Sequence, residues 1–142
     1  MAFGVATVVS YVGKAMMADR LAEAATYTAA PAYVGLGVGA EEGGGHTAEA
    51  SATKLVNEAK EANAPRVKGA FTFAEGGGHG VNNIMVLKGK QTAGTTEIKV
   101  NEAGVFDKTG ENKGNMAFYA TLNVDALAIG DSIEWTWKVE FS

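Results

Sequence analysis

The chain has 142 residues, of which 46% are hydrophobic and 20% are charged, so it can form one folded domain and is not disordered by composition. Its net charge of -4 excludes the basic surplus that nucleic-acid binding needs, and its lack of cysteine excludes disulfides and thiolate metal sites. The 19 glycines predict many turns between short strands. The apolar N-terminus has no basic region and is interrupted by Lys14, Asp19 and Arg20, so we expect neither a signal peptide nor a membrane span.

An apolar stripe runs through the N-terminal segment. Positions that share one face of a helix are apolar here, which predicts a helix over residues 5 to 25. This helix would lie in an N-terminal arm (residues 1–28) ahead of a β domain (residues 29–142), although the early β-branched valines leave its first turn open to a strand. The stripe packs either on the domain's own sheet or on a neighbouring subunit; in the second case the contact residues are Phe3, Val5, Val8, Val9 and Val12.

The middle of the chain alternates short strand signals with glycine-rich loops. Pro31 ends the N-terminal segment, and residues 33–38 follow as a short strand before the glycine-rich loop 39–47. Residues 48–62 are expected to form a short helix or an irregular arm, which Pro65 closes. An amphipathic strand over residues 66–73, with Phe71 on its apolar face, and a buried strand over residues 84–87 come before a loop at residues 91–96.

The strongest period-two pattern lies at the C-terminus. Apolar and polar residues alternate from 132 to 141, so Trp135 and Trp137 lie on one face of a half-buried antiparallel strand. Residues 116–122 alternate in the same way, with Phe118 on the apolar face, and Gly130-Asp131 marks the turn between the two strands. We expect a β-meander whose aromatic face covers the core, which includes Phe71, Phe118, Trp135 and Trp137.

These elements together predict a mainly β (α+β) fold in a single domain. The expected architecture is a compact antiparallel β-sandwich or barrel-like domain. It carries an N-terminal helix and glycine-rich loops.

No group of residues in the sequence has the spacing of a catalytic or metal site. His46 and His79, the only histidines, follow acidic residues and could in principle ligate zinc, but each lies in a glycine-rich loop that holds ligands poorly. No serine lies in a Gly-x-Ser-x-Gly turn, and no glycine run continues as a phosphate-binding loop. We therefore expect no enzyme activity, no cofactor and no metal, and we leave open whether the two histidine loops bind anything.

Short motifs follow one another in a fixed order in the C-terminal third. Residues 102–107 (Glu-Ala-Gly-Val-Phe-Asp) precede a glycine turn, an alternating strand, the pair Gly130-Asp131 and a last aromatic strand. This order resembles the end of a family of small structural proteins of tailed-bacteriophage virions, whose members are often labelled tail fibre protein or minor structural protein. The residues that carry the resemblance are Glu102, Gly104, Phe106, Asp107, Gly130 and Asp131.

The front half is similar to the same family in two places. Residues 31–37 (Pro-Ala-Tyr-Val-Gly-Leu-Gly) resemble the strand that follows the family's short N-terminal helix, and residues 53–58 resemble its Thr-x-Leu-x-x-Glu step. The family usually places an arginine a few residues after that glutamate, whereas here Arg66 lies beyond an alanine-rich insertion at residues 59–64. The glycine-rich loop at residues 39–47 is also longer than the resemblance leads us to expect.

The resemblance implies a structural role in a virion, without catalysis. The sequence has no long repeats, collagen triplets or heptads, so it is not a whole long fibre. A knob-like subunit would either decorate the outer surface of the head lattice as a cement protein, which we favour, or belong to the tail tip and contact a host receptor. The expected partners are other copies of the chain, in trimers or hexamers, and the major capsid protein or tail proteins of the same virion, with neither nucleic acid nor membrane.

A tail-tip protein would recognise a host glycan or protein through exposed aromatic side chains. The tyrosines are the candidates for this role, since their rings are apolar and their hydroxyls are polar. The alternative is that they are half-buried at strand edges. They are Tyr11, Tyr27, Tyr33 and Tyr119.

Overall fold

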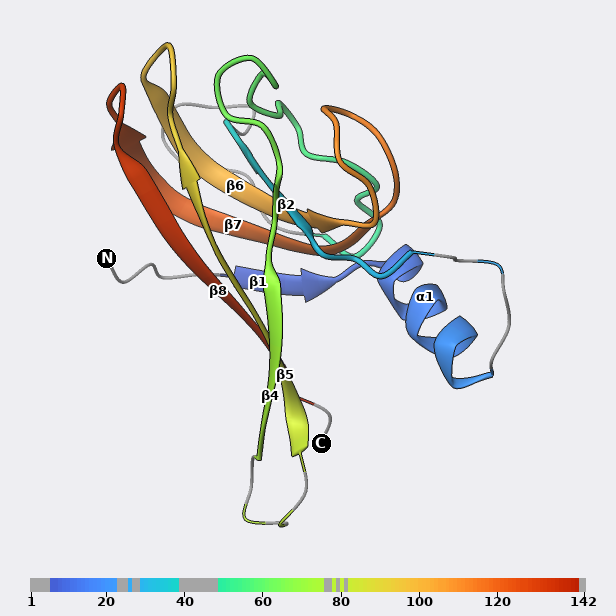
Figure 1. Cartoon of the computed structure of the whole chain (residues 1–142). Coiled ribbons are helices and arrows are strands. Elements are labelled where there is room, and N and C mark those ends of the chain that lie inside the picture. Colours follow the sequence, from blue (N-terminus) through green and yellow to red (C-terminus); the bar gives the residue numbers. More distant parts are fainter. Residues whose placement is uncertain are drawn as a thin grey trace.

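A computed structural model describes residues 6–22, 26, 29–38, 49–75, 78, 80 and 82–140 of the chain. The chain is mainly β, with antiparallel strands and one short helix near the N-terminus (Figure 1). The elements in order are β1 (Ala6–Val9), α1 (Tyr11–Leu21), β2 (Tyr33–Gly37), β3 (Val67–Lys68), β4 (Ala70–Glu75), β5 (Asn82–Thr92), β6 (Ile98–Phe106), β7 (Met116–Leu127) and β8 (Ser132–Glu140).

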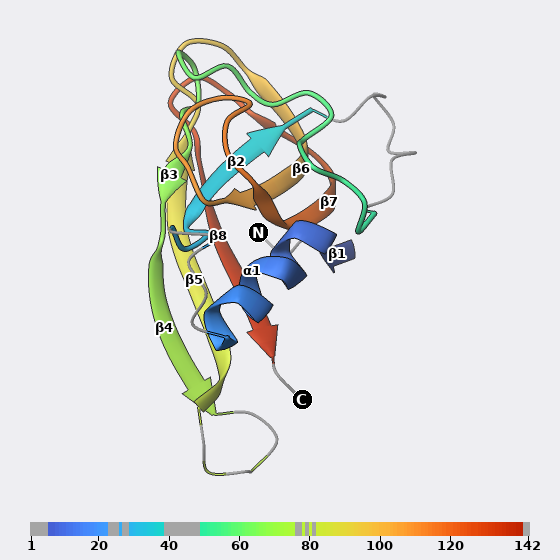
Figure 2. The same cartoon turned by 90° about the vertical axis from the view of Figure 1, so that its right-hand side faces the viewer.

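The strands form two antiparallel sheets. One has five strands in the order β1-β7-β6-β2-β3, and the other has three in the order β4-β5-β8. Figure 2 shows the sheets as two layers, with β4, β5 and β8 extending past the five-stranded sheet toward the β4–β5 turn. The predicted mainly β, sandwich-like fold is confirmed.

The main core lies between the two sheets. It joins side chains of β2, β6 and β7 to the inner face of the three-stranded sheet, where Trp135 and Trp137 are buried. The rings of Phe118 and Trp137 lie 6.5 Å apart across this interface. Phe71 lies half-buried at the margin of the core. A smaller cluster on the other face of the five-stranded sheet contains Leu55, Phe106, Met116 and Tyr119.

For the first turn of the predicted helix over residues 5 to 25, the sequence left a helix and a strand open, and the described residues form the strand. Residues 6–9 form β1, which pairs with β7, and the helix begins only after Ser10. The Ser10 hydroxyl accepts a hydrogen bond from the Gly13 amide at 2.9 Å, which caps the helix, while the β-branched residues before it favour a strand. Gly13 lets α1 lie against β7, because a Cβ there would collide with the Ala117 carbonyl.

The predicted β-meander is wrong in its last step. β6 and β7 form a hairpin, but β8 pairs with β5 in the other sheet. The turn between β7 and β8 explains the crossover: the Gly130 amide donates to the Ala93 carbonyl at 2.7 Å, and the Ala93 amide donates to the Asp131 carbonyl at 3.0 Å. These bonds fix the start of β8 beside the end of β5.

The single strand predicted over residues 66–73 is divided between the two sheets. β3 pairs with β2 and β4 pairs with β5, and Gly69 lies at the break. A Cβ at Gly69 would lie 2.6 Å from Leu87 and 2.8 Å from Trp135, so the chain crosses where only glycine fits. β5 continues to Thr92, which includes two residues predicted to be loop.

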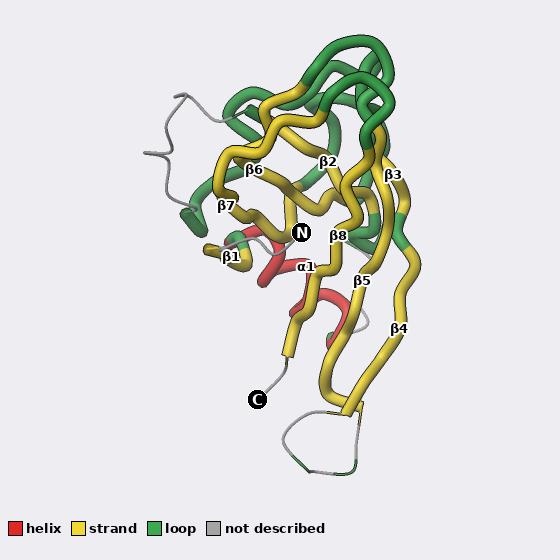
Figure 3. The backbone as a smooth tube through the Cα atoms, turned by 90° about the vertical axis from the view of Figure 1, so that its left-hand side faces the viewer, coloured by secondary structure: helices red, strands yellow, loops and turns green. Residues whose placement is uncertain are grey.

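The segment at residues 49–66 crosses the outer face of the five-stranded sheet without a helix, so of the two structures predicted for residues 48–62 the described part takes the irregular one. An isolated bridge joins Glu58 to Gly37 at the end of β2. Figure 3 shows this segment as loop beside β2 and β6. We call residues 49–66 the covering segment.

Candidate functional site

Five buried polar residues hold the covering segment and the β6–β7 loop in place. We call Glu58, Arg66, Glu102, Asp107 and Tyr119 the polar network; all are buried. Arg66 and Glu58 form a bidentate ion pair, with Nε–Oε1 at 2.6 Å and Nη2–Oε2 at 2.9 Å. Because both side chains are almost wholly removed from water, each depends on the other for a countercharge.

Arg66 also organises the loop between β6 and β7. Its Nη1 donates to the carbonyls of Lys108 at 2.9 Å and Lys113 at 2.6 Å. Its guanidinium stacks 3.4 Å from the centre of the Phe106 ring. The Glu58 carboxylate meanwhile accepts from the Asn112 amide at 2.8 Å. The pair therefore fixes a loop whose own backbone bonds are few.

Glu102 performs the same task on the other half of the covering segment. Its carboxylate accepts from the backbone amides of Val56 at 3.0 Å and Asn57 at 2.9 Å, and from the Tyr119 hydroxyl at 2.8 Å. Burial, together with this bond, raises the pKa of Tyr119 well above its ordinary value. Gly37 makes room for the arrangement, because a Cβ there would lie 2.6 Å from Glu102 Oε1.

Asp107, directly after β6, holds the far end of the β6–β7 loop. Its Oδ1 accepts from the Asn115 amide at 2.7 Å, and its Oδ2 accepts from the Asn115 side chain at 2.8 Å. Gly114 has a φ of 73°, and a Cβ there would collide with Asp107 Oδ1, so both its conformation and its surroundings require glycine. Gly104 packs against Met116 and Phe106 in the same region.

The chemistry that this network supports is structural. Glu58 and Glu102 use both carboxylate oxygens as acceptors from the protein itself, and so does Asp107. General acid–base catalysis needs a carboxyl group within reach of a substrate proton, which these buried groups do not offer. The motif residues on β6 thus lie together in a network that shapes the fold, while Gly130 and Asp131 lie apart at the β7–β8 turn.

The sequence did not reveal two members of this arrangement. For Tyr119 the sequence offered either an exposed ligand contact or a half-buried place at a strand edge, whereas the side chain is fully buried against Glu102. The ion pair of Arg66 was obscured by the insertion at residues 59–64, which the structure accommodates without separating Arg66 from Glu58. The period-two pattern around residue 119 holds the only signal for Tyr119, because it places this residue opposite Phe118 on the second face of β7.

The predicted subunit contacts at the N-terminus are divided by the fold. Phe3 and Val5 lie outside the described residues. Val8 is half-buried against the smaller cluster, and Val9 and Val12 are half-buried against the main core. Part of the apolar stripe is therefore used within the chain itself.

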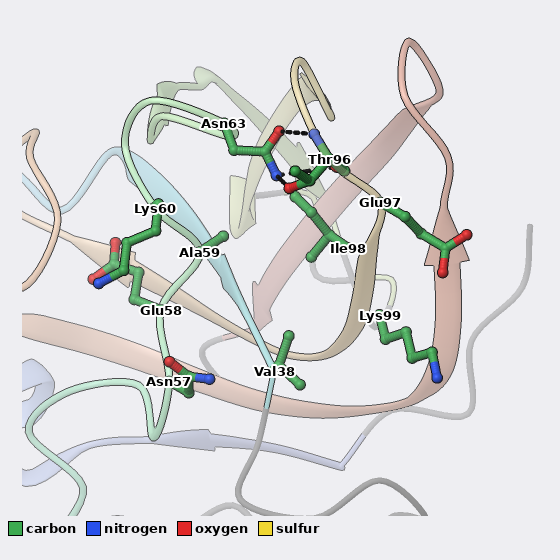
Figure 4. Close-up of a pocket in the computed structure, with 10 residues that line it drawn as sticks. All are labelled: Val38, Asn57, Glu58, Ala59, Lys60, Asn63, Thr96, Glu97, Ile98 and Lys99. Carbon is green, nitrogen blue, oxygen red and sulfur yellow. Dashed lines mark hydrogen bonds between the residues drawn. The ribbon is translucent and has the colours of Figure 1, made fainter.

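An open, polar hollow of about 640 Å³ lies where the covering segment meets the start of β6 (Figure 4). Asn63 shapes one rim: its side-chain oxygen accepts from the amides of Thr95 at 2.7 Å and Thr96 at 3.0 Å, and its amide nitrogen donates to the Thr96 hydroxyl at 2.8 Å. On the other rim Lys60 is paired with Glu111 at 2.8 Å, which lowers the pKa of Glu111. These groups satisfy one another rather than converge on a ligand.

A second, apolar groove of about 530 Å³ lies between α1 and the three-stranded sheet. Met16, Met17 and Leu21 line it from the helix, and Phe71 and Met85 line it from the sheet. Its elements lie near the end of the molecule where β4 and β5 project (Figure 2).

The other candidate ligand residues are not brought together. His46 and His79 lie outside the described residues, as does Tyr27. Tyr33 is half-buried, whereas Tyr11 is exposed at the start of α1. Within the described ranges no group of three or more histidine or acidic residues could hold a metal ion, and no helix is long and apolar enough to cross a membrane.

Comparison with known proteins adds no relative. The chain matches no family model, no curated protein and no solved structure.

Proposed function

We propose that the chain is a non-enzymatic structural protein of a tailed-phage virion, and that it decorates the outer surface of the head lattice as a cement protein. Its partners in this role are further copies of itself and the major capsid protein. Many copies on a symmetric lattice each need only a modest contact area, because neighbouring contacts add avidity.

One observation carries this proposal. The residues by which the chain resembles the phage family, among them Glu58, Glu102, Phe106 and Asp107, meet in the polar network and its surroundings. A motif made of groups that hold the backbone is what a scaffold with a structural role requires. Such a motif is evidence for a fold shared with the phage family, and it is weaker evidence for binding or catalytic chemistry.

The preference for the head over a fibre rests on shape. The described residues form a short sandwich from which the β4–β5 end projects, with α1 beside it (Figure 1). A fibre needs repeats or a coiled-coil shaft, and the sequence contains neither. A small knob-like subunit suits attachment to a lattice.

Cryo-electron microscopy of intact particles from the phage that encodes the chain tests the proposal. The expected result is density for the sandwich at regular intervals over the head. Density confined to the tail end would overturn the decoration role. Absence of the chain from purified particles, checked by mass spectrometry, would overturn a virion role altogether.

A tail-tip subunit that contacts a host receptor is the second candidate. The observation in its favour is Tyr11, whose ring is 65% exposed and lies within 5.7 Å of the Lys14 ammonium group. Exposed tyrosine is enriched at interfaces, because its ring is apolar and its hydroxyl is polar. Under this candidate, Tyr11→Ala should lower adsorption of phage to host cells, whereas a head decoration protein should tolerate the change.

A further inference from the structure

β4 is an edge strand with little to protect it from pairing with another chain. It is the outermost strand of its sheet, and no other described strand pairs with its free side. Figures 2 and 3 both show it along the outside of the molecule. Residues 69–74 contain no charge and no proline, two of the features by which proteins block an exposed edge, and the one irregularity of its pairing lies at the far end, between Ala74 and Glu75.

The inner face of β4 also leaves an aromatic side chain uncovered. Phe73 pairs with Met85 across the sheet and lies on the same face as Phe71. Its side chain is nevertheless 66% exposed, because the three-stranded sheet extends past the five-stranded sheet here. Since Met85 also lines the apolar groove beside α1, the exposed ring continues an apolar surface.

Opposite charges flank the uncharged stretch of β4 and favour a second copy of the chain as the partner. Lys68, the last residue of β3, precedes this stretch and Glu75 ends it, and both are exposed. Two identical strands placed antiparallel bring the basic end of each beside the acidic end of the other. A parallel arrangement would instead place like charges together.

We propose that β4 is a self-association surface, at which two copies of the chain pair antiparallel about a two-fold axis to form one continuous six-stranded sheet. The register that the residues favour places Thr72 opposite Thr72 of the second copy. Phe71 then lies opposite Phe73 of the second copy, so two aromatic pairs form on the inner face. In the same register, Glu75 reaches the second copy's Gly69, next to Lys68.

This contact deepens the proposed function, since it names the surface through which copies of the virion subunit meet. A two-fold contact is self-complementary and closes after two chains. Backbone hydrogen bonds along the strand supply affinity, and the aromatic pairs supply the register. A hexamer built from three such pairs contains the same contact.

Sedimentation velocity of the purified chain, over micromolar to submillimolar concentrations, is the first test. We expect a monomer–dimer equilibrium that Phe73→Lys weakens by about tenfold or more, because both aromatic pairs are lost. Ile129→Lys is the matched control: Ile129 is 64% exposed but lies in the β7–β8 turn, so dimerisation should persist. Far-ultraviolet circular dichroism of both variants establishes that they are folded.

Charge reversal tests the antiparallel orientation. Lys68→Glu and Glu75→Lys, each alone, place two like-charged contacts at the interface and should weaken the dimer. The double variant restores opposite charges at both ends and should recover it. Equal effects of the single and double variants would overturn the proposed orientation.

A cysteine cross-link tests the register directly, because the natural chain has no cysteine. Directly opposed residues of an antiparallel pair have Cα atoms about 4.5–5.5 Å apart, within the range that a disulfide spans. Thr72→Cys should therefore form a disulfide-linked dimer under mild oxidation, while Ile129→Cys should not.

A chain that stays monomeric at all concentrations, or a dimer that Phe73→Lys leaves intact, would overturn the β4 contact. Open-ended aggregates that Phe73→Lys dissolves would also overturn it, because the proposed contact closes after two copies. These results leave the virion role to be judged by particle imaging. Conversely, a β4 dimer of a chain that is absent from particles would remove the virion role and keep the contact.

Discussion

The covering segment and the β4–β5 end differ in a way that their secondary structure would not suggest: the irregular segment is well packed, and the regular strand is partly exposed. The covering segment has no helix, yet Glu58 and Glu102 hold its backbone and its own Leu55 side chain is fully buried. β4 is a regular strand, yet its outer edge is unpaired within the described residues and Phe73 remains exposed. Irregular backbone is therefore no guide to weakness in this protein.

The difference separates a region whose polar groups are paired within the chain from a region that could still bind a partner. Around the polar network, buried donors and acceptors meet one another, so a partner would gain little there. Along β4, no other described strand pairs with the outer backbone groups, so these groups and the exposed apolar area could meet a second chain. Substitutions in the first region should lower the stability of the monomer, while substitutions in the second should change association.

Loss of the Arg66 side chain should have the largest effect. Arg66→Ala leaves the Glu58 carboxylate buried without its countercharge and releases the Lys108 and Lys113 carbonyls. Breaking a buried ion pair from one side costs about 3–5 kcal/mol. Urea denaturation at pH 7 should show this loss in the free energy of unfolding.

The exposed ion pair between Lys60 and Glu111 provides the control. The Lys60 side chain is 76% exposed, and the pair lies in water at the rim of the polar hollow. Lys60→Ala should leave the urea midpoint unchanged, because exposed pairs contribute little. If Arg66→Ala were as mild as Lys60→Ala, the polar network would not be what holds the covering segment.

Tyr119→Phe should have the next largest effect. It removes the hydroxyl that donates to Glu102, a bond to a charged group worth about 1.5–3 kcal/mol. The two backbone amides remain on Glu102, so the covering segment should stay in place. The free energy of unfolding at pH 8 measures the loss.

The stabilisation that the Tyr119 hydroxyl contributes should also depend on pH. The pKa of Tyr119 is raised in the folded chain above its ordinary value of 10.0, so its contribution is complete below pH 10 and is lost as the pH rises above that value. The difference in unfolding free energy between the natural chain and Tyr119→Phe should thus be constant from pH 8 to 9.5 and shrink at higher pH. A difference that grew with alkaline pH would contradict the Tyr119–Glu102 bond.

Gly89→Ala tests packing between β5 and β8 in the three-stranded sheet. A Cβ at Gly89 would collide with the ring of Trp135 on β8, and overpacking of this kind costs about 1–3 kcal/mol. Combining Gly89→Ala with Trp135→Phe should cost less than the sum of the two changes, since the smaller ring removes the collision. A double-mutant cycle of urea midpoints measures this coupling, and strict additivity would contradict the packing.

The sequence predicted the strand types well because a local pattern carried them. The alternation at residues 132–141 gave β8 with its buried tryptophans, and the alternation from Met116 gave β7. Strand partners depend on distant contacts, so the sequence assigned β8 to β7 when two bonds at Ala93 align it with β5. The sequence did not predict the break at Gly69 either, because Trp135 and Leu87 become its neighbours only in the folded chain.

The polar network was visible from sequence only in part. Glu102 and Asp107 stood out through a resemblance, but nothing local shows that a glutamate on β6 will accept from amides some 45 residues earlier. The exposed Phe73 was equally hidden, since it continues the alternation of a strand whose inner face should be covered. Whether that face is covered depends on the different extents of the two sheets, which no periodicity encodes.

Apart from the Lys60→Ala control, Phe73→Lys should have the smallest effect on the stability of the monomer, and so it gives the sharpest contrast with the covering segment. Because the ring is 66% exposed, its replacement should change the free energy of unfolding by less than about 0.5 kcal/mol, similar to other surface substitutions. The measurement must be made at low protein concentration, since any dimer would add stability to the natural chain alone. The difference in unfolding free energy between the natural chain and Phe73→Lys should then increase with protein concentration, because dimerisation stabilises the natural chain. A loss above about 1 kcal/mol at the lowest concentration would mean that Phe73 packs within its own chain. The β4–β5 end would then stabilise the monomer, as the covering segment does.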